Sequence, residues 1–216
     1  LKADVFEPDV APLAVQGPKS DALMSRVFGE EMKALRFFRH VKGDFNGHKF
    51  TIARSGFSVQ GGFEIYVDGS ENGEAIWDAL FSAGQDLNVK AGCPNGIERI
   101  EGGLLSYGND MTIENTPFEA GLGKFCKGRA AEGCIGSAVL QAEIDNGSKR
   151  QIRGLKISGS AVPACTDSWI IENADGEFAG QVTSAAWSPD FGINVALGMV
   201  EAKNWELGEN LSDDEL

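Results

Sequence analysis

One short segment of the chain combines a glycine-rich loop with a carboxylate and a phenol, a pairing of side chains that could do chemistry. The loop, residues 54–62, runs directly into an apolar strand at residues 63–67. Successive side chains of a strand point to opposite faces, so Glu64 and Tyr66 share one face while Phe63 faces the other way. We therefore expect Glu64 and Tyr66 to lie together at the mouth of the loop, where a polar, planar ligand can dock.

The sequence offers few other residues for catalysis or metal binding. It contains four cysteines and no Cys-x-x-Cys pair, and its only histidines are His40 and His48. That inventory argues against a zinc site and against a cysteine–histidine nucleophile, so we expect no metal. The Gly-x-Gly triplets of the sequence lie in turns, without the preceding strand and following helix of a nucleotide-binding loop. We therefore expect no flavin or nicotinamide cofactor.

Composition narrows the class of protein further. The chain has 216 residues, 42% hydrophobic and 24% charged, with a formal net charge of -13. An excess of acid disfavours nucleic-acid binding, which needs clustered Lys and Arg, and no apolar run is long enough to span a bilayer. We expect a cytoplasmic protein with free thiols that contacts neither nucleic acid nor membrane, and we leave a homodimer open.

Hydrophobic periodicity and turn residues predict an α+β fold. We expect helices over residues 18–28, 70–83, 94–104 and 137–144, because each has apolar residues at helical spacing beside a Pro, Ser or Gly boundary. We expect strands at residues 50–52, 63–67, 151–157, 177–184 and 193–200. The last three form a β-rich module at the C-terminal end.

Six ordered segments resemble motifs of the glycine-cleavage T-protein family, the folate-dependent aminomethyltransferases. They lie at residues 13–18, 54–67, 99–104, 107–110, 116–123 and 180–189. Within the family, residues 57–62, 93–95 and 123–126 are most similar to the dimethylsulfoniopropionate demethylase branch. The resemblance covers most of the chain.

The resemblance implies a three-part fold, of which this chain would carry the later portion. Residues 1–40 would end an inserted ferredoxin-like domain, residues 41–127 would be the second segment of the central folate-binding domain, and residues 128–216 would form a C-terminal β-barrel. The first part of the family fold, with an aspartate used near the folate, would be missing. We therefore expect this 216-residue chain alone to be inactive.

The resemblance also assigns roles to the first segment. The family places its folate-binding glutamate at the position of Glu64, whose carboxylate can accept two N–H groups from one edge of a reduced pterin. The alternative is a solvated strand residue paired with a lysine. Tyr66 would contact folate or substrate, or would only be an aromatic residue on a half-buried strand.

Aromatic residues outside that strand are further candidates. Phe57 in the loop is a candidate folate contact. Phe37 and Phe38 could form an aromatic wall for a sulfonium substrate through cation–π attraction, with Phe38 as the proposed substrate residue. The alternative for such a pair is core packing, which we favour for one of the two.

Residues further along the chain carry less specific signals. Tyr107 and Trp187 are candidate folate contacts, with helix capping and barrel packing as their alternatives. Asn95 stands where the T-protein often has an arginine that helps hold folate. For Arg99 we expect a buried structural ion pair.

Three functions follow as hypotheses. The first is a tetrahydrofolate-dependent methyltransferase that demethylates dimethylsulfoniopropionate to methylthiopropionate and forms 5-methyltetrahydrofolate. The second is a T-protein-like aminomethyltransferase of glycine cleavage, which needs a lipoyl carrier protein as partner. The third is a folate-binding module without turnover. Tetrahydrofolate is the expected co-substrate in the first two.

Overall fold

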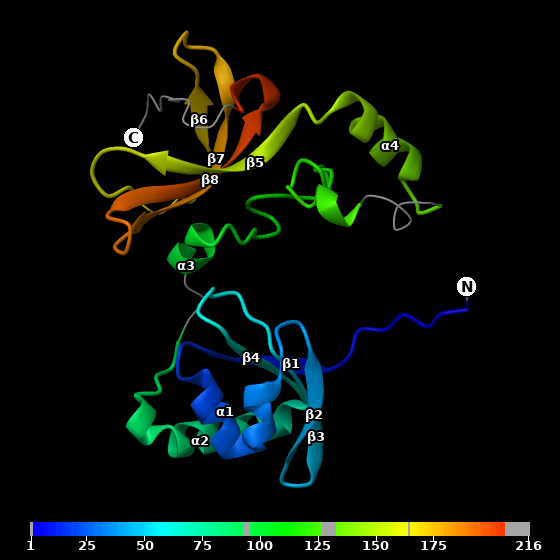
Figure 1. Cartoon of the computed structure of the whole chain (residues 1–216), viewed down its shortest axis with the longest axis vertical. Coiled ribbons are helices and arrows are strands. Elements are labelled where there is room, and N and C mark those ends of the chain that lie inside the picture. Colours follow the sequence, from blue (N-terminus) through cyan, green and yellow to red (C-terminus); the bar gives the residue numbers. More distant parts are fainter. Residues whose placement is uncertain (1, 93–95, 127–132, 164, 206–216) are drawn as a thin grey trace. The chain divides into compact units, whose positions relative to one another are not determined.

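The computed structural model describes residues 2–92, 96–126, 133–163 and 165–205. The chain divides into two compact units, Leu1–Asn95 and Gly96–Leu216, and each is described by itself (Figure 1).

The first unit contains a four-stranded antiparallel sheet. Its strands are β1 (Val10–Gln16), β2 (His40–Phe45), β3 (His48–Ala53) and β4 (Gly62–Asp68), in the order β1-β4-β3-β2. Phe63, Ile65 and Val67 alternate along β4 and are fully buried, whereas Glu64 and Tyr66 point to the opposite face. The alternation of apolar and polar residues along this strand therefore predicted correctly which of its side chains are buried.

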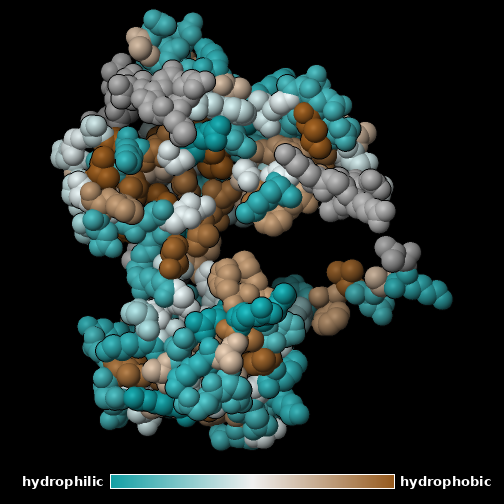
Figure 2. Space-filling view, in the orientation of Figure 1, coloured by the Kyte–Doolittle hydropathy of each residue, from teal (hydrophilic) through white to brown (hydrophobic). Residues whose placement is uncertain are grey.

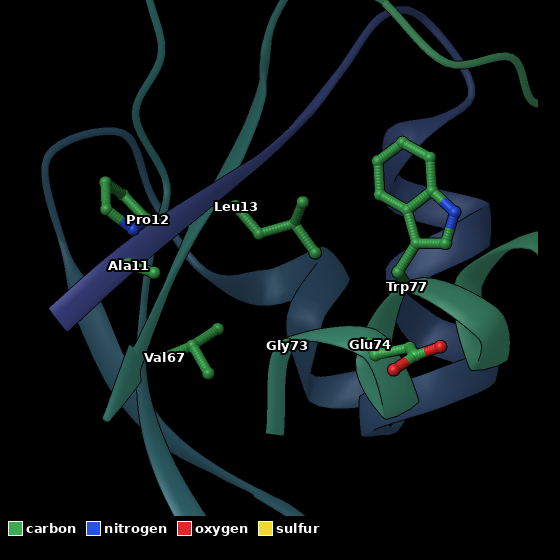
Figure 3. Close-up of a pocket in the computed structure, with 7 residues that line it drawn as sticks. All are labelled: Ala11, Pro12, Leu13, Val67, Gly73, Glu74 and Trp77. Atoms are coloured by element: carbon green, nitrogen blue, oxygen red, sulfur yellow. The ribbon is translucent and has the colours of Figure 1, made fainter. Parts of the chain in front are cut away.

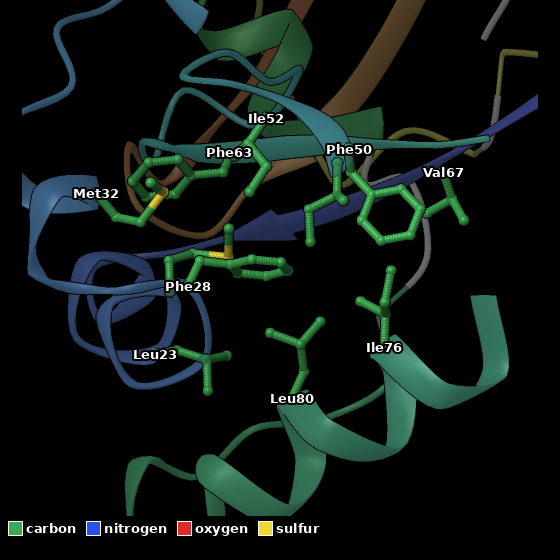
Figure 4. Packing of buried hydrophobic residues seen from close by; sticks show 11 residues of the cluster. Leu23, Phe28, Met32, Phe50, Ile52, Phe63, Val67, Ile76 and Leu80 are labelled. Atoms are coloured by element: carbon green, nitrogen blue, oxygen red, sulfur yellow. The ribbon is translucent and has the colours of Figure 1, made fainter. Parts of the chain in front are cut away.

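Two helices supply the other half of this core. They are α1 (Ser20–Phe28) and α2 (Gly73–Ala83), accompanied by the 3-10 turns Glu30–Ala34, Ser70–Asn72 and Gln85–Leu87. Leu23 and Phe28 from α1 and Ile76 and Leu80 from α2 meet the apolar face of the sheet (Figure 4). The sheet therefore has one face packed in the core and one face free of these helices.

The second unit is built on another antiparallel sheet. Its strands are β5 (Arg150–Ile157), β6 (Trp169–Glu172), β7 (Phe178–Ser188) and β8 (Ile193–Glu201), in the order β5-β8-β7-β6. Helices α3 (Gly96–Glu101) and α4 (Ser137–Asn146) precede the sheet, and short 3-10 turns lie at Gly123–Phe125 and Ala202–Asn204.

The second unit buries two groups of apolar side chains. One centres on Ile171, Ala179 and Val200, and the other joins Ile100 of α3 to Leu197 of β8. In the part of the chain that the structure describes, no helix is long and apolar enough to cross a membrane.

The predicted α+β fold is confirmed, and so are four helices, although their limits shift. The second helix begins at Gly73 after a 3-10 turn, and the third ends at Glu101, so Leu104 lies outside it. Pro94 lies outside the described residues. Strands β1, β2 and β6 were not predicted. The domain boundaries near residues 40 and 127 remain a prediction.

Candidate functional site

Glu64 and Tyr66 lie side by side on the sheet face that the helices leave uncovered. Glu64 is half-buried, and its neighbours across the sheet are Ala14 on β1 and Ala53 on β3. Tyr66, with 36% of its surface exposed, lies between Pro12 and Thr51. Because both neighbours of Glu64 across the sheet are alanines, no large side chain on the adjacent strands shields its carboxylate. A flat ligand can therefore approach it.

Two hydroxyl groups hold the Glu64 carboxylate. The Ser55 hydroxyl donates a short hydrogen bond to Glu64 Oε2, and the Tyr66 hydroxyl also bonds Glu64. Partial burial, followed by the negative charge of Glu64 and this bond, raises the pKa of Tyr66. A carboxylate has about four acceptor positions, so two hydroxyl donors leave acceptor capacity for a ligand.

No cation neutralises Glu64 among the residues that the structure describes. Its neighbour Arg54 is directed elsewhere: its guanidinium contacts Asp21, with Nη1 2.6 Å from Oδ1, and lies 4.8 Å from the centre of the Phe63 ring. The lysine pair of the alternative reading, a solvated strand residue, is thus not present within those residues, and the role of Glu64 in binding folate stays a prediction. The charge of Glu64 remains available to a ligand.

Gln16 fixes the loop that carries Ser55. Its side-chain nitrogen donates to the carbonyl oxygens of Ser55 (3.1 Å) and Phe63 (3.2 Å), and its Oε1 accepts from the Ser58 hydroxyl (2.8 Å). A Cβ on Gly56 would lie 1.9 Å from Gln16 Oε1. Glycine at this position therefore lets Gln16 join the end of β1 to the loop and to β4.

The aromatic candidates in the first unit lie at the surface. Phe57 is 48% exposed, Phe37 is 63% exposed and Phe38 is 75% exposed, and the last two rings contact each other with centroids 4.2 Å apart. The expectation that one of the Phe37–Phe38 pair packs in the core is wrong. Figure 2 shows hydrophobic residues at the surface between hydrophilic ones, with the broadest hydrophobic area in the upper part of the view.

The turn that carries Phe38 is attached to the Glu64 site. Phe38 N–H donates to the Arg54 carbonyl (3.0 Å), and Arg54 N–H donates to the Arg39 carbonyl (2.9 Å). Arg54 directly precedes Ser55, so the Phe38 turn and the hydroxyl that holds Glu64 adjoin each other along the backbone.

Tyr107 and Trp187 belong to the second unit, so the structure does not group them with Glu64. Tyr107 is 70% exposed in a turn bridged to Met111, and Trp187 lies partly buried on β7 opposite Asn194. Their proposed contacts with folate remain predictions. Asn95 lies outside the described residues.

Arg99 forms the buried ion pair that its position suggested. Its Nη1 lies 2.6 Å from Asp110 Oδ2, and its Nη2 donates to Ser184 Oγ at 2.6 Å. Asp110 also accepts from the Ser184 and Thr183 hydroxyls and from Ser106 N–H. With every charge satisfied internally, this cluster is structural.

A second feature of the first unit is a groove whose lining is mostly apolar. It has a volume of about 320 Å³ and is lined by apolar residues of β1, β4 and α2 together with Glu74 (Figure 3). It includes neither Glu64 nor Tyr66. Within the described ranges, no three His, Cys, Asp or Glu side chains are grouped to hold a metal ion.

Sequence reasoning missed Ser55, Gln16 and Asp21 as parts of this site. Ser55 and Gln16 each lie inside a segment that the family resemblance covers, but their contacts depend on the loop conformation and on the β1–β4 pairing. The one available signal was a polar Gln16 at the end of an apolar strand, directly before Gly17 and Pro18.

Comparison with known proteins agrees with this fold and these motifs. Residues 3–129 match the family model of the GCVT N-terminal domain, and residues 150–212 match that of the glycine cleavage T-protein C-terminal barrel domain. The chain belongs to the glycine cleavage T-protein family.

Individual relatives refine the position within the family. The chain is 58% identical, over 96% of its length, to dimethylsulfoniopropionate demethylase DmdA of Ruegeria pomeroyi, of which it covers 56%. It is 32% identical, over 96% of its length, to an aminomethyltransferase of Bacillus subtilis, of which it covers 57%. The chain thus spans little more than half the length of these curated relatives.

A solved structure supports the fold. The crystal structure of glycine cleavage system aminomethyltransferase T from Bartonella henselae matches 94% of this chain and 55% of that chain. The TM-score is 0.77 at 24% sequence identity, a likeness that establishes the fold alone.

Proposed function

We propose that the protein is a tetrahydrofolate-dependent methyltransferase that demethylates dimethylsulfoniopropionate, producing methylthiopropionate and 5-methyltetrahydrofolate. The observation that supports this most strongly is the 58% identity to a dimethylsulfoniopropionate demethylase, compared with 32% to an aminomethyltransferase. The site supports it as well, because no cation of the described part of the chain neutralises the charge of Glu64.

The reaction places modest demands on the protein. The N5 lone pair of the folate attacks the sulfonium methyl carbon, the sulfur–carbon bond breaks, and its electron pair leaves with a neutral thioether. The methylated N5 then releases its proton to water. Since the leaving group is already activated, alignment of the two reactants contributes most of the acceleration.

In this proposal Glu64 accepts hydrogen bonds from the amino edge of the pterin, each worth about 1.5–3 kcal/mol for a charged acceptor. Ser55 orients the carboxylate, and Tyr66 lies beside the bound ring. Phe57 contacts the folate, and Phe38 offers an aromatic face to the sulfonium cation. Tyr107 and Trp187 remain predicted folate contacts that the proposal does not need.

Turnover by the full-length protein tests the proposal directly. Incubation with tetrahydrofolate and dimethylsulfoniopropionate should yield 5-methyltetrahydrofolate and methylthiopropionate in equal amounts. Activity only with an aminomethyl-lipoyl carrier protein would instead establish the aminomethyltransferase, the function of the Bacillus subtilis relative. Folate binding without any product would favour a binding module. A cytoplasmic location is part of the proposal and is tested by cell fractionation.

A further inference from the structure

The side-chain amide of Gln16 bonds the loop before β4 at two points and β4 itself at a third. Its Nε2 donates to the carbonyl oxygen of Ser55 (3.1 Å), the residue whose hydroxyl bonds Glu64, and to that of Phe63 (3.2 Å). Its Oε1 accepts from the Ser58 hydroxyl at 2.8 Å. An amide has two N–H donors and one carbonyl acceptor, so every polar group of this side chain has a partner.

The loop leaves a close-fitting space for this amide. A Cβ on Gly62 would lie 2.6 Å from Gln16 Nε2, and a Cβ on Gly56 would lie 2.5 Å from the same atom. Both distances are shorter than van der Waals contact, so a side chain at either position would displace the amide. The two glycines therefore keep room for Gln16 on two sides.

Val59, in the middle of the loop, has an unfavourable backbone conformation. Its φ is 61°, in the left-handed region, which β-branched residues rarely adopt. The other non-glycine residues with a positive φ in the described part of the chain are Phe38, Asn46 and Asn88, of which the asparagines tolerate it best. The Val59 side chain is 62% exposed, so burial offsets little of the strain. The rest of the loop must therefore impose this conformation.

Hydrogen bonds on both sides of the strained residue impose it. Before it, the Ser58 hydroxyl donates to Gln16 Oε1 and accepts from the Gln60 N–H at 3.3 Å. After it, the Gly61 carbonyl accepts from the Gly17 N–H at 2.9 Å. Because Gln16 and Gly17 are consecutive, the end of β1 holds the loop both before and after the strained residue.

We infer that Gln16 is a positioning residue of the proposed reaction. Its hydrogen bonds hold the loop against the strain at Val59 and thereby keep the Ser55 hydroxyl on Glu64. Without these bonds, Val59 relaxes toward ordinary backbone angles and the loop moves. Ser55 then no longer fixes the carboxylate that receives the pterin. The inference rests on the proposed function, because it assumes that Glu64 binds folate.

Urea unfolding of the full-length protein tests the first half of this inference without any ligand. Gln16→Met keeps the length and neutrality of the side chain but removes the three hydrogen bonds of the amide. In the wild-type background, Val59→Gly should lower the unfolding equilibrium constant about threefold or more, because glycine adopts a positive φ without strain. In the Gln16→Met background the gain should be clearly smaller, because the loop has already relaxed.

Asn46→Gly is the matched control for this comparison. Asn46 also has a positive φ, of 53°, but it lies in the turn between β2 and β3, at the other end of β3 from the loop. Its substitution should have the same effect with and without Gln16→Met. Ser58→Ala removes one of the three bonds alone and should act in the same direction as Gln16→Met, but more weakly. This variant tests the inference even if Gln16→Met does not fold.

Calorimetric dissociation constants of tetrahydrofolate test the second half. Gln16→Met should weaken binding about threefold to tenfold, as Ser55→Ala does, and the two together should weaken it little further, because both release the same hydrogen bond to Glu64. Adding Val59→Gly to Gln16→Met should restore part of the affinity, because an unstrained loop keeps its conformation more easily without the amide. A side chain that only stabilises the fold would produce neither the non-additive pair nor the recovery.

The outcomes separate the two proposals. Equal stabilisation by Val59→Gly in both backgrounds, or an unchanged folate affinity in Gln16→Met, would overturn the inference and leave the proposed function standing. Additive losses in Gln16→Met with Ser55→Ala would also overturn it, because Gln16 would then act by another route. If the wild type does not bind tetrahydrofolate, the proposed function is wrong, and the positioning role falls with it whatever the unfolding measurements show.

Discussion

At the scale of single residues, the account depends on a carboxylate that is oriented by hydrogen bonds but has no cationic partner among the residues with a described structure. Glu64 receives hydrogen bonds from Ser55 and Tyr66, while Arg54, the nearest arginine in sequence, pairs with Asp21. Hydroxyl donors fix the geometry of a carboxylate without supplying a compensating positive charge. Such a group is prepared to accept the N–H groups of a neutral heterocycle.

Ser55 is therefore expected to matter for binding more than for stability. Ser55→Ala removes one hydrogen bond to a charged acceptor and lets the Glu64 carboxylate rotate. We predict a rise of about threefold to tenfold in the dissociation constant of tetrahydrofolate, with unfolding unchanged within about 1 kcal/mol. Ser82→Ala, on the exposed side of α2, is the control. Equal affinity in the two variants would show that Ser55 does not orient Glu64.

The Tyr66 phenol reports on the charge of Glu64. Burial and the adjacent carboxylate both disfavour the phenolate, so the pKa of Tyr66 should lie above its usual value of about 10. The chain has two tyrosines, so Tyr107→Phe leaves Tyr66 as the only one to titrate. In that background we predict that Glu64→Gln lowers the pKa of Tyr66, measured from tyrosinate absorbance. An unchanged pKa would mean that the two side chains are uncoupled.

Some of this site was predictable from the sequence and some was not. Strand alternation alone placed Glu64 and Tyr66 together and Phe63 in the core, as observed. The contacts of Ser55 and Gln16 were not predictable, since a hydrogen bond across 39 residues depends on the path of the loop. Exposure of both Phe37 and Phe38 also runs against their hydrophobicity.

At the scale of elements, the loop from Arg54 to Gly62 needs glycine at a defined point. Gly62 has a φ of 151°, and a Cβ there would lie 2.3 Å from the Val15 carbonyl oxygen. Gly61 also has a positive φ, of 76°, but no atom lies within 4 Å of its Cβ position. An alanine at residue 61 would therefore meet backbone strain alone, whereas an alanine at residue 62 would also meet a steric conflict.

Urea unfolding of two variants tests this distinction. Gly61→Ala should cost about 1–2 kcal/mol, the strain of a left-handed residue. Gly62→Ala should cost at least about 1 kcal/mol more than that, because the β1–β4 pairing must also shift. If both substitutions cost the same, the close approach of β1 is not what requires glycine at residue 62.

The elements missed from sequence have identifiable causes. Strand β1 contains Pro12, which ordinarily argues against a strand, and β1 is an edge strand of its sheet, where proline is tolerated. Strand β2 contains Gly43, whose Cβ position is occupied by Ile52 Cδ1 at 2.4 Å. Both strands form because tertiary packing outweighs local propensity.

At the scale of the whole molecule, pH-dependent stability should depend on the buried Arg99–Asp110 pair. Burial raises the pKa of Asp110, but hydrogen bonds from Ser184, Ser106 and Thr183 and the charge of Arg99 outweigh it, and the net pKa is lowered. A carboxyl whose pKa is lower in the folded state stabilises the fold above its unfolded pKa. That contribution is lost as the pH falls through the folded pKa.

We predict that the free energy of unfolding declines as the pH is lowered from about 5 toward 3, where carboxyl groups titrate. Asp110→Asn should destabilise the protein by about 3–5 kcal/mol at pH 7, because it leaves Arg99 buried without a partner charge, and should flatten the acid decline. Glu177→Gln, which removes an exposed pair with Lys203, is the control and should change little. An acid decline as steep in Asp110→Asn as in wild type would contradict this assignment.

The family and the α+β class were predictable at this scale because six short motifs keep their order along the chain. The 58% identity to a demethylase and the two matching family models agree with that resemblance. Motif order carries no information about individual side-chain contacts. The Asp110 cluster, which joins residues 73 and 74 positions apart, therefore became visible only in the structure.

The central claim is that the Glu64 carboxylate holds the amino edge of a reduced folate. Its most direct test is the dissociation constant of tetrahydrofolate for the full-length protein and for Glu64→Gln, measured by calorimetry under one set of conditions. The account predicts at least a tenfold weakening, about 1.4 kcal/mol, with the unfolding free energy nearly unchanged. An identical dissociation constant in the two proteins would contradict it and remove Glu64 from the site.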